Sequence, residues 1–143
     1  LEGRIGALLV CYTDLLGLQG RLSEGWQAAL EKVGTLIYLG TNECATSRMA
    51  QLVLPTAAFA EREGTVTNFE LRVQLQRKAF DPAGESMPGW AIICRLGETL
   101  GGEYSFADSR AVFSALAFSV PGFSGLDYDK IGSTGCQAVI TKA

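Results

Sequence analysis

The sequence contains no histidine, and this one absence removes several classes of catalytic site. A Ser-His-Asp triad, a Cys-His pair, a histidine-ligated zinc ion and a histidine-ligated haem all require an imidazole ring. Basic residues are also scarce, because 12 Lys and Arg stand against 15 Asp and Glu, for a formal net charge of −3. Nucleic-acid-binding domains carry a basic surface, so we expect no nucleic-acid partner. Any catalysis by these residues would depend on carboxylates, Lys, Tyr or Cys.

Clustered cysteines are absent as well. The four cysteines are Cys11, Cys44, Cys94 and Cys136, and no two of them form a Cys-x-x-Cys motif. Iron–sulfur clusters and structural zinc sites need clustered thiolates, so we expect no metal centre in these residues. Cys11 and Cys94 directly follow the apolar residues 8–10 and 91–93, and we expect all four cysteines to be buried free thiols.

Long apolar segments are also missing. The longest uncharged stretch covers residues 111–126 and is broken by Pro121, whereas a membrane-spanning helix needs roughly 20 apolar residues. We therefore expect no direct membrane insertion. The sequence begins close to an apolar run and lacks the basic segment and long apolar stretch of a signal peptide, so we expect a cytoplasmic piece of a larger chain.

The N-terminal residues predict an α/β arrangement. Two short apolar runs, residues 5–12 and 35–39, are typical of strands buried on both faces of a parallel sheet. Between them, Ser23 is the predicted N-cap of a helix, and the apolar residues that follow it recur at helical spacing: Trp26, Ala29, Leu30 and Val33. Residues 51–54 predict a third strand, which gives a Rossmann-like fragment. The Gly-x-Gly-x-x-Gly fingerprint of dinucleotide sites is absent.

The later residues have a different pattern. Leu71, Val73 and Leu75 alternate with polar neighbours, which predicts an exposed strand in a hairpin-like segment. Residues 88–100 and 109–120 predict two helices, the second of them capped by Asp108 or Ser109. The expected buried faces of the two helices are Trp90, Ile93, Cys94, Gly97 and Leu100, and Val112, Phe113, Leu116, Ala117 and Val120. Val139 and Ile140 are expected to form a terminal strand.

These elements predict one α/β fold: a partial Rossmann-like parallel sheet with flanking helices, followed by a hairpin-like segment and two C-terminal helices. Residues 1–60 are expected to form a βαβ-type half. Residues 61–143 are expected to supply the hairpin or turn segment and the helical C-terminal part of the same domain.

Three linked motifs make the chain recognisable. Residues 50–68 read AQLVLPTAAFAEREGTVTN, residues 70–74 read ELRVQ, and residues 82–90 read PAGESMPGW. In order and spacing they resemble the molybdopterin oxidoreductase superfamily. That superfamily typically shows Ala-Asp-Val-Val-Leu-Pro, Glu-x-x-Gly-Thr-Phe-x-Asn, Glu-Gly-Arg-Val-Gln or Glu-Arg-Arg-Val-Gln, and Pro-x-Gly-Glu-x-x-Pro-x-Trp. The resemblance covers residues 3–102.

The resemblance leaves two branches open. One is formate dehydrogenase and its relatives, which bind a molybdopterin guanine dinucleotide. The other is the large iron–sulfur subunit of NADH-quinone oxidoreductase (respiratory complex I), whose C-terminal region resembles a molybdoenzyme but generally carries no molybdenum cofactor. Formate dehydrogenase would make this chain part of a catalytic subunit, whereas the complex I subunit would make it a non-catalytic structural domain.

Departures from the motifs favour the complex I subunit as the sequence-based interpretation. Cofactor-binding members follow the first strand with Gly-x-Asn-Pro, whereas this chain has Tyr12 or Thr13 at the glycine and Asp14 and Leu15 at Asn-Pro. A bulky side chain and a new carboxylate would obstruct and repel a dinucleotide. The acid of the Ala-Asp-Val-Val-Leu-Pro motif is also replaced, here by Gln51.

The complex I subunit implies that the parent carries iron–sulfur clusters outside these residues and that this piece holds no cofactor. The expected partners are the remaining domains of the parent and other respiratory-complex subunits. The expected place is the inner face of the bacterial plasma membrane. Molybdopterin guanine dinucleotide is expected only for the formate dehydrogenase alternative.

Candidate site residues come from the family-motif turn. We expect Glu61, Gly64, Thr65, Asn68, Arg72 and Gln74 to form a special turn at a domain junction, with Gly64 in a positive-φ conformation. No catalytic residue is predicted. Glu61 and Glu63 could form an acid–base pair, but their position in a loop favours two solvated surface carboxylates. Arg72, Arg77 and Lys78 read as an exposed strand edge, and Trp90 as a core anchor.

Overall fold

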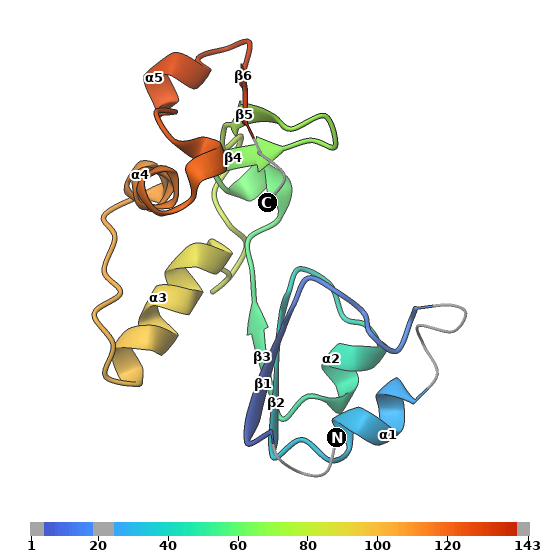
Figure 1. Ribbon diagram of the computed structural model, residues 1–143. Coiled ribbons are helices and arrows are strands. Elements are labelled where there is room, and N and C mark those ends of the chain that lie inside the picture. The colour runs from blue at the N-terminus through green and yellow to red at the C-terminus, as the bar shows by residue number, and fades with distance from the viewer. Residues whose placement is uncertain (1–4, 19–24, 140–143) are drawn as a thin grey trace. The chain divides into compact units, whose positions relative to one another are not determined.

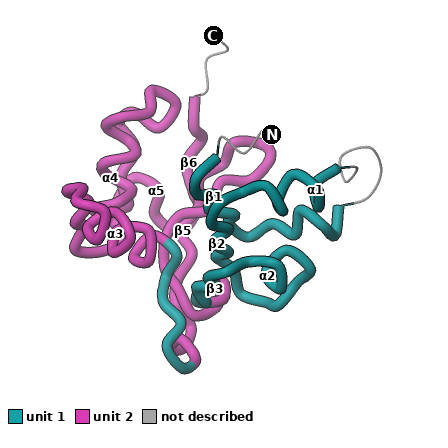
Figure 2. The backbone as a smooth tube through the Cα atoms, turned by 90° about the horizontal axis from the view of Figure 1, so that it is seen from below, with its two compact units in different colours: residues 1–57, 84–89 teal, residues 58–83, 90–143 magenta. Residues whose placement is uncertain are grey.

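The computed structural model describes residues 5–18 and 25–139. These residues form helices and two three-stranded sheets, one parallel and one antiparallel (Figure 1). The predicted fold class is therefore confirmed. The chain divides into two compact units (Figure 2). Unit 1 comprises residues 1–57 and 84–89, and unit 2 comprises residues 58–83 and 90–143.

Unit 1 contains the parallel sheet. Its strands are β1 (Ala7–Cys11), β2 (Thr35–Gly40) and β3 (Leu52–Pro55), in the order β1-β2-β3. All three strands were predicted from short apolar runs, and their parallel pairing follows the expected βαβ connection. The carboxyl ends of parallel strands lie at one edge of a sheet, which places the residues after β2 and β3 beside one another.

Two short helices accompany this sheet. They are α1 (Trp26–Leu30) and α2 (Ala45–Met49). Helix α1 follows Gly25, which has a φ of 81°, while the predicted cap Ser23 lies outside the described residues. The helix ends before Val33, which is buried beyond its C-terminus. The core of unit 1 is formed by Val10, Leu30, Leu36 and Tyr38.

Gln51 has a structural role in unit 1. Its side-chain oxygen accepts a hydrogen bond from the backbone N–H of Leu36 at 2.6 Å, and its own N–H donates to the Leu36 carbonyl at 3.0 Å. An amide oxygen here supplies an acceptor that a carboxylate would also supply. The replacement of the family's acid by Gln51 therefore leaves this contact intact.

Unit 2 contains the antiparallel sheet, with β4 (Gly64–Thr67), β5 (Arg72–Gln76) and β6 (Cys136–Gln137). Its helices are α3 (Gly89–Thr99), α4 (Ser109–Ser119) and α5 (Tyr128–Ile131), with short 3-10 turns η2 (Phe59–Glu61) and η3 (Pro121–Phe123). The buried core of this unit is Val73, Phe113, Ala117, Ile131 and Ala138. Asp108 caps α4 by accepting from the Ala111 N–H at 2.8 Å, as predicted.

Of the residues predicted for the buried face of α3, Trp90, Cys94 and Gly97 are half-buried, but Ile93 and Leu100 are exposed. Ile92 is buried, whereas the predicted Ile93 and Leu100 are 48% and 86% exposed. On α4, Phe113 and Ala117 are buried as predicted, but Leu116 and Val120 are each 38% exposed. A repeating apolar pattern fits two adjacent helix faces, and tertiary packing selects one of them.

Two further predictions need correction. The four cysteines are free, as expected, but each is half-buried rather than buried. The last strand is Cys136–Gln137, and Val139 beyond it is 70% exposed, so the predicted strand at Val139 is wrong. Ile140 lies outside the described residues.

The β4–β5 hairpin corrects the expectation for Gly64. Gly64 begins β4 and is not among the residues with positive φ, whereas Leu71 has a φ of 64°. Residues 68–71 form the turn, because the Leu71 N–H donates to the Asn68 carbonyl at 3.0 Å. A left-handed residue completing such a turn matches the glycine of the family's Glu-Gly-Arg-Val-Gln motif. The special backbone conformation therefore exists, but at Leu71.

Candidate functional site

An open pocket lies at the carboxyl ends of β2 and β3 in unit 1. Its volume is about 400 Å³. It is lined by Gly40, Thr41, Asn42, Glu43, Ser47, Arg48, Val53 and Pro55. Ligands of open α/β sheets bind at the carboxyl ends of the strands, and pockets of this volume suit small molecules. The pocket is therefore the candidate binding site of unit 1.

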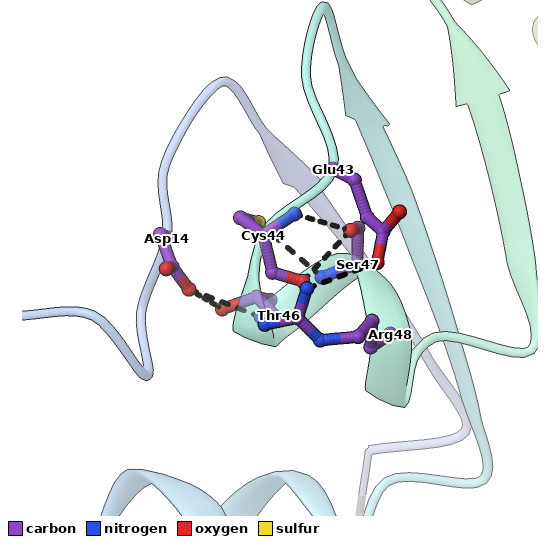
Figure 3. A network of polar contacts seen from close by, with 6 residues as sticks. All are labelled: Asp14, Glu43, Cys44, Thr46, Ser47 and Arg48. Atoms are coloured by element: carbon purple, nitrogen blue, oxygen red, sulfur yellow. Dashed lines mark hydrogen bonds and ion pairs between the residues drawn. The ribbon is translucent and has the colours of Figure 1, made fainter.

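Helix α2 contributes Ser47 and Arg48 to the pocket lining, and its first turn is closely hydrogen-bonded (Figure 3). The Cys44 N–H donates to the Ser47 hydroxyl at 2.8 Å, and the Ser47 N–H donates to the Cys44 Sγ at 3.4 Å. The Ser47 hydroxyl donates in turn to the Cys44 carbonyl at 2.9 Å. This reciprocal capping closes the helix start and leaves the following residue, Arg48, at the pocket.

Asp14 ties the loop after β1 to the same helix (Figure 3). Its Oδ1 accepts from the Thr46 N–H at 3.0 Å and from the Thr46 hydroxyl at 2.7 Å. The Thr46 hydroxyl also accepts from the Leu16 N–H at 3.1 Å, and Thr46 is fully buried. Hydrogen bonds from Thr46 lower the pKa of Asp14. From the sequence, the Asp14 carboxylate was expected to repel a dinucleotide. In the structure this carboxylate instead holds the start of α2 in place.

The pocket carries one cation and one anion. Arg48 Nη1 lies 2.9 Å from Glu43 Oε1, and the carboxylate raises the pKa of Arg48. Both side chains are well exposed, so a ligand can compete for either group. Asn42 and Thr41 add an amide and a hydroxyl, joined by a 3.2 Å hydrogen bond. These four side chains can bind an anionic group and an N–H donor of the same ligand at the same time.

The Tyr38 ring lies next to Gly40 of the pocket lining, and its hydroxyl is not suited to proton transfer. Its hydroxyl interacts with Cys44, which together with burial raises the pKa of Tyr38 to about 12. A phenol with this pKa stays protonated at neutral pH. A Cβ at Gly40 would overlap the Tyr38 ring, so glycine is favoured at this position of the pocket lining.

The six predicted turn residues lie in unit 2, and none lines the pocket. Asn68 Oδ1 accepts from the N–H groups of Glu70 and Arg72 at 3.0 and 2.9 Å. Arg72 Nη1 donates to the Thr134 carbonyl at 2.9 Å. Thr65 and Gln74 occupy the β4–β5 ladder. Within unit 2, the described contacts of Asn68 and Arg72 hold the hairpin, and docking of this segment against further domains stays a prediction.

The two glutamates of the motif also make structural contacts. Glu61 accepts from the N–H groups of Ala58 at 2.8 Å and Ala83 at 3.3 Å. Glu63 accepts from the Ser109 hydroxyl at 3.4 Å. The carboxylates hold different parts of the chain, so this geometry does not pair them for acid–base catalysis.

The remaining predicted residues of unit 2 form no reactive group. Lys78 pairs with Asp81 at 2.7 Å on the surface, and Arg77 is exposed. Trp90 is half-buried near the start of α3. Among the described residues, no group of three or more Cys, Asp or Glu could hold a metal ion.

Sequence reasoning missed the pocket residues, although a signal was present. Gly40, Thr41 and Asn42 directly follow a buried strand of a parallel sheet, which is where such folds bind ligands. The sequence alone did not distinguish Arg48 from an ordinary surface cation, because the position of Arg48 at the pocket depends on the capping of α2. The role of Thr46 could not be predicted from the sequence either, since its hydrogen-bond partner Asp14 is 32 residues away.

The structure has an α/β fold with a candidate binding pocket, and comparisons with known proteins assign the family. The molybdopterin oxidoreductase family profile matches residues 25–99, which is more than half of the chain. The chain therefore belongs to the molybdopterin oxidoreductase family. The superfamily expected from the sequence motifs is confirmed.

Two similar curated proteins are formate dehydrogenase subunits. The F420-dependent formate dehydrogenase 2 subunit alpha of Methanococcus maripaludis is 37% identical over 94 residues, covering 64% of this chain and 14% of that protein. The F420-dependent formate dehydrogenase subunit alpha of Methanocaldococcus jannaschii is 34% identical over 111 residues, covering 76% of this chain and 16% of that protein. The chain thus spans about one-sixth or less of their length. These relatives do not support the specific placement with the complex I subunit.

A solved structure shares the fold. Acetylene hydratase from Pelobacter acetylenicus superposes with a TM-score of 0.67 at 17% identity, covering 87% of this chain and 17% of that chain. At this identity the likeness concerns the fold alone. Separately, none of the helices in residues 5–18 and 25–139 has the length and apolar character needed to cross a membrane.

Proposed function

We propose that this chain is a domain of the catalytic subunit of a molybdopterin-dependent formate dehydrogenase, where it binds the nucleotide end of the cofactor. The pocket at the carboxyl ends of β2 and β3 carries this proposal, because it offers a cation, an anion, an amide and a hydroxyl within about 400 Å³. The formate dehydrogenase names of the relatives support the choice of reaction. The sequence-based preference for the complex I subunit becomes the second candidate.

The pocket residues fit a guanine nucleotide chemically. Arg48 can donate to a phosphate, and Glu43 can accept from the N–H groups on the edge of guanine. Thr41 and Asn42 can bond the ribose or the phosphate. The separation of Arg48 from Glu43 is the rearrangement that binding requires, because the two groups now neutralise each other at 2.9 Å. Bound molybdopterin would supply the redox-active metal, and these four residues would position its distal nucleotide.

The reaction assigned to the whole subunit is the oxidation of formate to carbon dioxide, which releases two electrons and one proton. Three groups are poorly suited to take that proton, since Glu61 and Glu63 accept structural hydrogen bonds and the pKa of Tyr38 is about 12. In this proposal the chain contributes binding and orientation of the cofactor.

A non-catalytic domain of the complex I type is the second candidate, and one observation favours it. Asp14 is engaged with Thr46, and Tyr12 or Thr13 stands where cofactor-binding relatives have a small residue. The residues that follow β1 are therefore occupied by contacts within the protein. In this case the pocket would be a remnant without a cofactor.

Formate oxidation by the full-length protein tests the first candidate. We expect formate-dependent reduction of a viologen dye, and we expect Arg48→Gln to lower cofactor content at least about tenfold, because a hydrogen bond to a charged group is lost. Arg77→Gln is the matched control, since Arg77 is an exposed cation outside the pocket. Full activity and cofactor content in Arg48→Gln would contradict the role of the pocket.

A further inference from the structure

Four of the polar side chains that line the pocket form two pairs. Arg48 Nη1 lies 2.9 Å from Glu43 Oε1, and the Asn42 amide donates to the Thr41 hydroxyl at 3.2 Å. A ligand that binds to any of these groups must therefore compete with a contact that already exists. The charged pair matters more than the neutral pair, because hydrogen bonds to charged groups are the stronger ones.

Both charged residues are positioned by α2. Glu43 directly precedes the N-cap residue Cys44, and Arg48 lies in the last turn of the helix. The Arg48 N–H donates to the Cys44 carbonyl at 3.1 Å, so the backbones of the two charged residues are fixed relative to each other. The ion pair can therefore open by rotation of two long side chains, without movement of the helix.

The ion pair is accessible and weak enough for a ligand to open it. The side chains of Arg48 and Glu43 are 63% and 72% exposed. An exposed ion pair stabilises a protein only slightly, because water solvates both charges once they separate. Opening therefore lowers the affinity for a ligand by a small factor, and the contacts that the ligand makes decide whether this factor is recovered.

Once separated, the two charged groups need different partners. The Arg48 guanidinium binds an anion such as a phosphate, and the Glu43 carboxylate accepts from N–H donors. A ligand that carries only an anion reaches Arg48 but stays close to the Glu43 carboxylate, which repels it. Guanine presents two neighbouring N–H donors to a carboxylate, whereas adenine presents one donor beside an acceptor nitrogen. A guanine nucleotide therefore satisfies both groups, and an adenine nucleotide does not.

We propose that the Glu43–Arg48 ion pair determines the specificity of the pocket, by favouring ligands that combine a phosphate with guanine over simple anions and adenine nucleotides. The proposal rests on the nucleotide-binding function proposed above. Glu43 acts in two ways, because it binds guanine directly and because it occupies Arg48 when guanine is absent. The ion pair does not distinguish one phosphate from two, so this role is compatible with a dinucleotide that is joined by a pyrophosphate.

Substitution of Glu43 by glutamine tests this role in the full-length protein prepared without cofactor. Glutamine keeps the length of the side chain but removes its charge and one acceptor oxygen. We expect Glu43→Gln to strengthen binding of inorganic pyrophosphate and of ADP about threefold, because Arg48 is released from its ion pair. The same substitution should weaken binding of GDP about fivefold, because one of two hydrogen bonds to guanine is lost. Equilibrium dialysis at one ionic strength measures all three affinities.

Two further variants control for indirect effects. Glu85→Gln is the matched control, because Glu85 is an exposed carboxylate of unit 1 that lies outside the pocket lining. It should leave all three affinities unchanged. In an Arg48→Gln background, the effect of Glu43→Gln on pyrophosphate binding should nearly disappear, because the cation that it releases is missing.

Opposite changes for GDP and pyrophosphate are the distinguishing result, because a distorted pocket would weaken binding of both. Changes of the same sign, or unchanged affinities for pyrophosphate and ADP, would overturn the specificity role of the ion pair. Binding of GDP to the wild-type protein would in that case still support the proposed function. A wild-type protein that does not bind GDP would refute the proposed function and the selection of guanine, even if Glu43→Gln binds pyrophosphate more tightly.

Discussion

Replacing Phe113 by alanine is expected to lower the free energy of unfolding of unit 2 by about 4 kcal/mol. Phe113 is 3% exposed and lies on the buried face of α4. Its ring centroid is 6.3 Å from that of Phe123 and 5.9 Å from that of Tyr128, so one truncation removes two aromatic contacts and leaves a cavity. Denaturant unfolding, followed by a probe within unit 2, measures the loss.

Phe118→Ala is the control for this variant, because Phe118 lies on the same helix and is 94% exposed. We expect its effect to stay within about 0.5 kcal/mol. Comparable losses for the two variants would show that the core of unit 2 is not centred on Phe113. The aromatic cluster would then not be what orders α4 and α5 around the sheet.

Asp14→Ala is expected to destabilise unit 1 by about 2 kcal/mol, because it leaves two donors of the fully buried Thr46 without their charged acceptor. Asp14→Asn should cost less, since the amide keeps one oxygen acceptor. Loss of the Thr46 anchor should also displace the start of α2 and weaken ligand binding at Arg48. Unfolding and nucleotide affinity can be measured on the same preparations.

The pH dependence of this contribution follows from the pKa of Asp14. Hydrogen bonds from Thr46 place the pKa below its usual value in the folded state. The unfolded chain therefore binds the proton first, and the stabilisation is complete above about pH 4 and falls as the pH drops through the lowered folded pKa. The difference in stability between wild type and Asp14→Ala should shrink with acidification below about pH 4. A difference that is constant with pH would contradict a carboxylate role.

Much of the fold could be predicted because short-range patterns determine it. The apolar runs of β1 and β2 and the Asp108 cap of α4 are local signals, and the structure contains each of them. The motif turn was also visible, but its left-handed residue is Leu71 rather than Gly64. Glycine identity alone therefore did not locate the turn, because Asn68 fixes the turn by its side-chain hydrogen bonds.

The site was harder to predict, because it depends on contacts between distant residues. Asp14 looked like a repulsive charge in the sequence, yet its partner Thr46 makes it a support for α2. From the sequence, Tyr12 was expected to obstruct a dinucleotide. In the structure its side chain lies against Gly89, which is far away in the sequence. Arg48 had no distinguishing sequence context, and only the capping of α2 places it at the pocket.

The choice between the two branches of the family depended on which departures from the motifs matter. The sequence-based preference for the complex I subunit treated Tyr12 or Thr13, together with Asp14, as signs that cofactor binding had been lost. The hydrogen bond of Asp14 with Thr46 gives one of these departures a structural role. The pocket lies at the ends of β2 and β3 and not at the end of β1. The relatives then favour the formate dehydrogenase interpretation.

Molybdenum and pterin stoichiometry of the purified full-length protein tests the proposed function most directly. The pocket at β2 and β3 predicts bound guanine nucleotide released on acid denaturation, together with stoichiometric molybdenum or its analogue tungsten. Protein that is folded, carries iron–sulfur clusters and contains neither pterin nor these metals would contradict the proposal and support a non-catalytic domain of the complex I type.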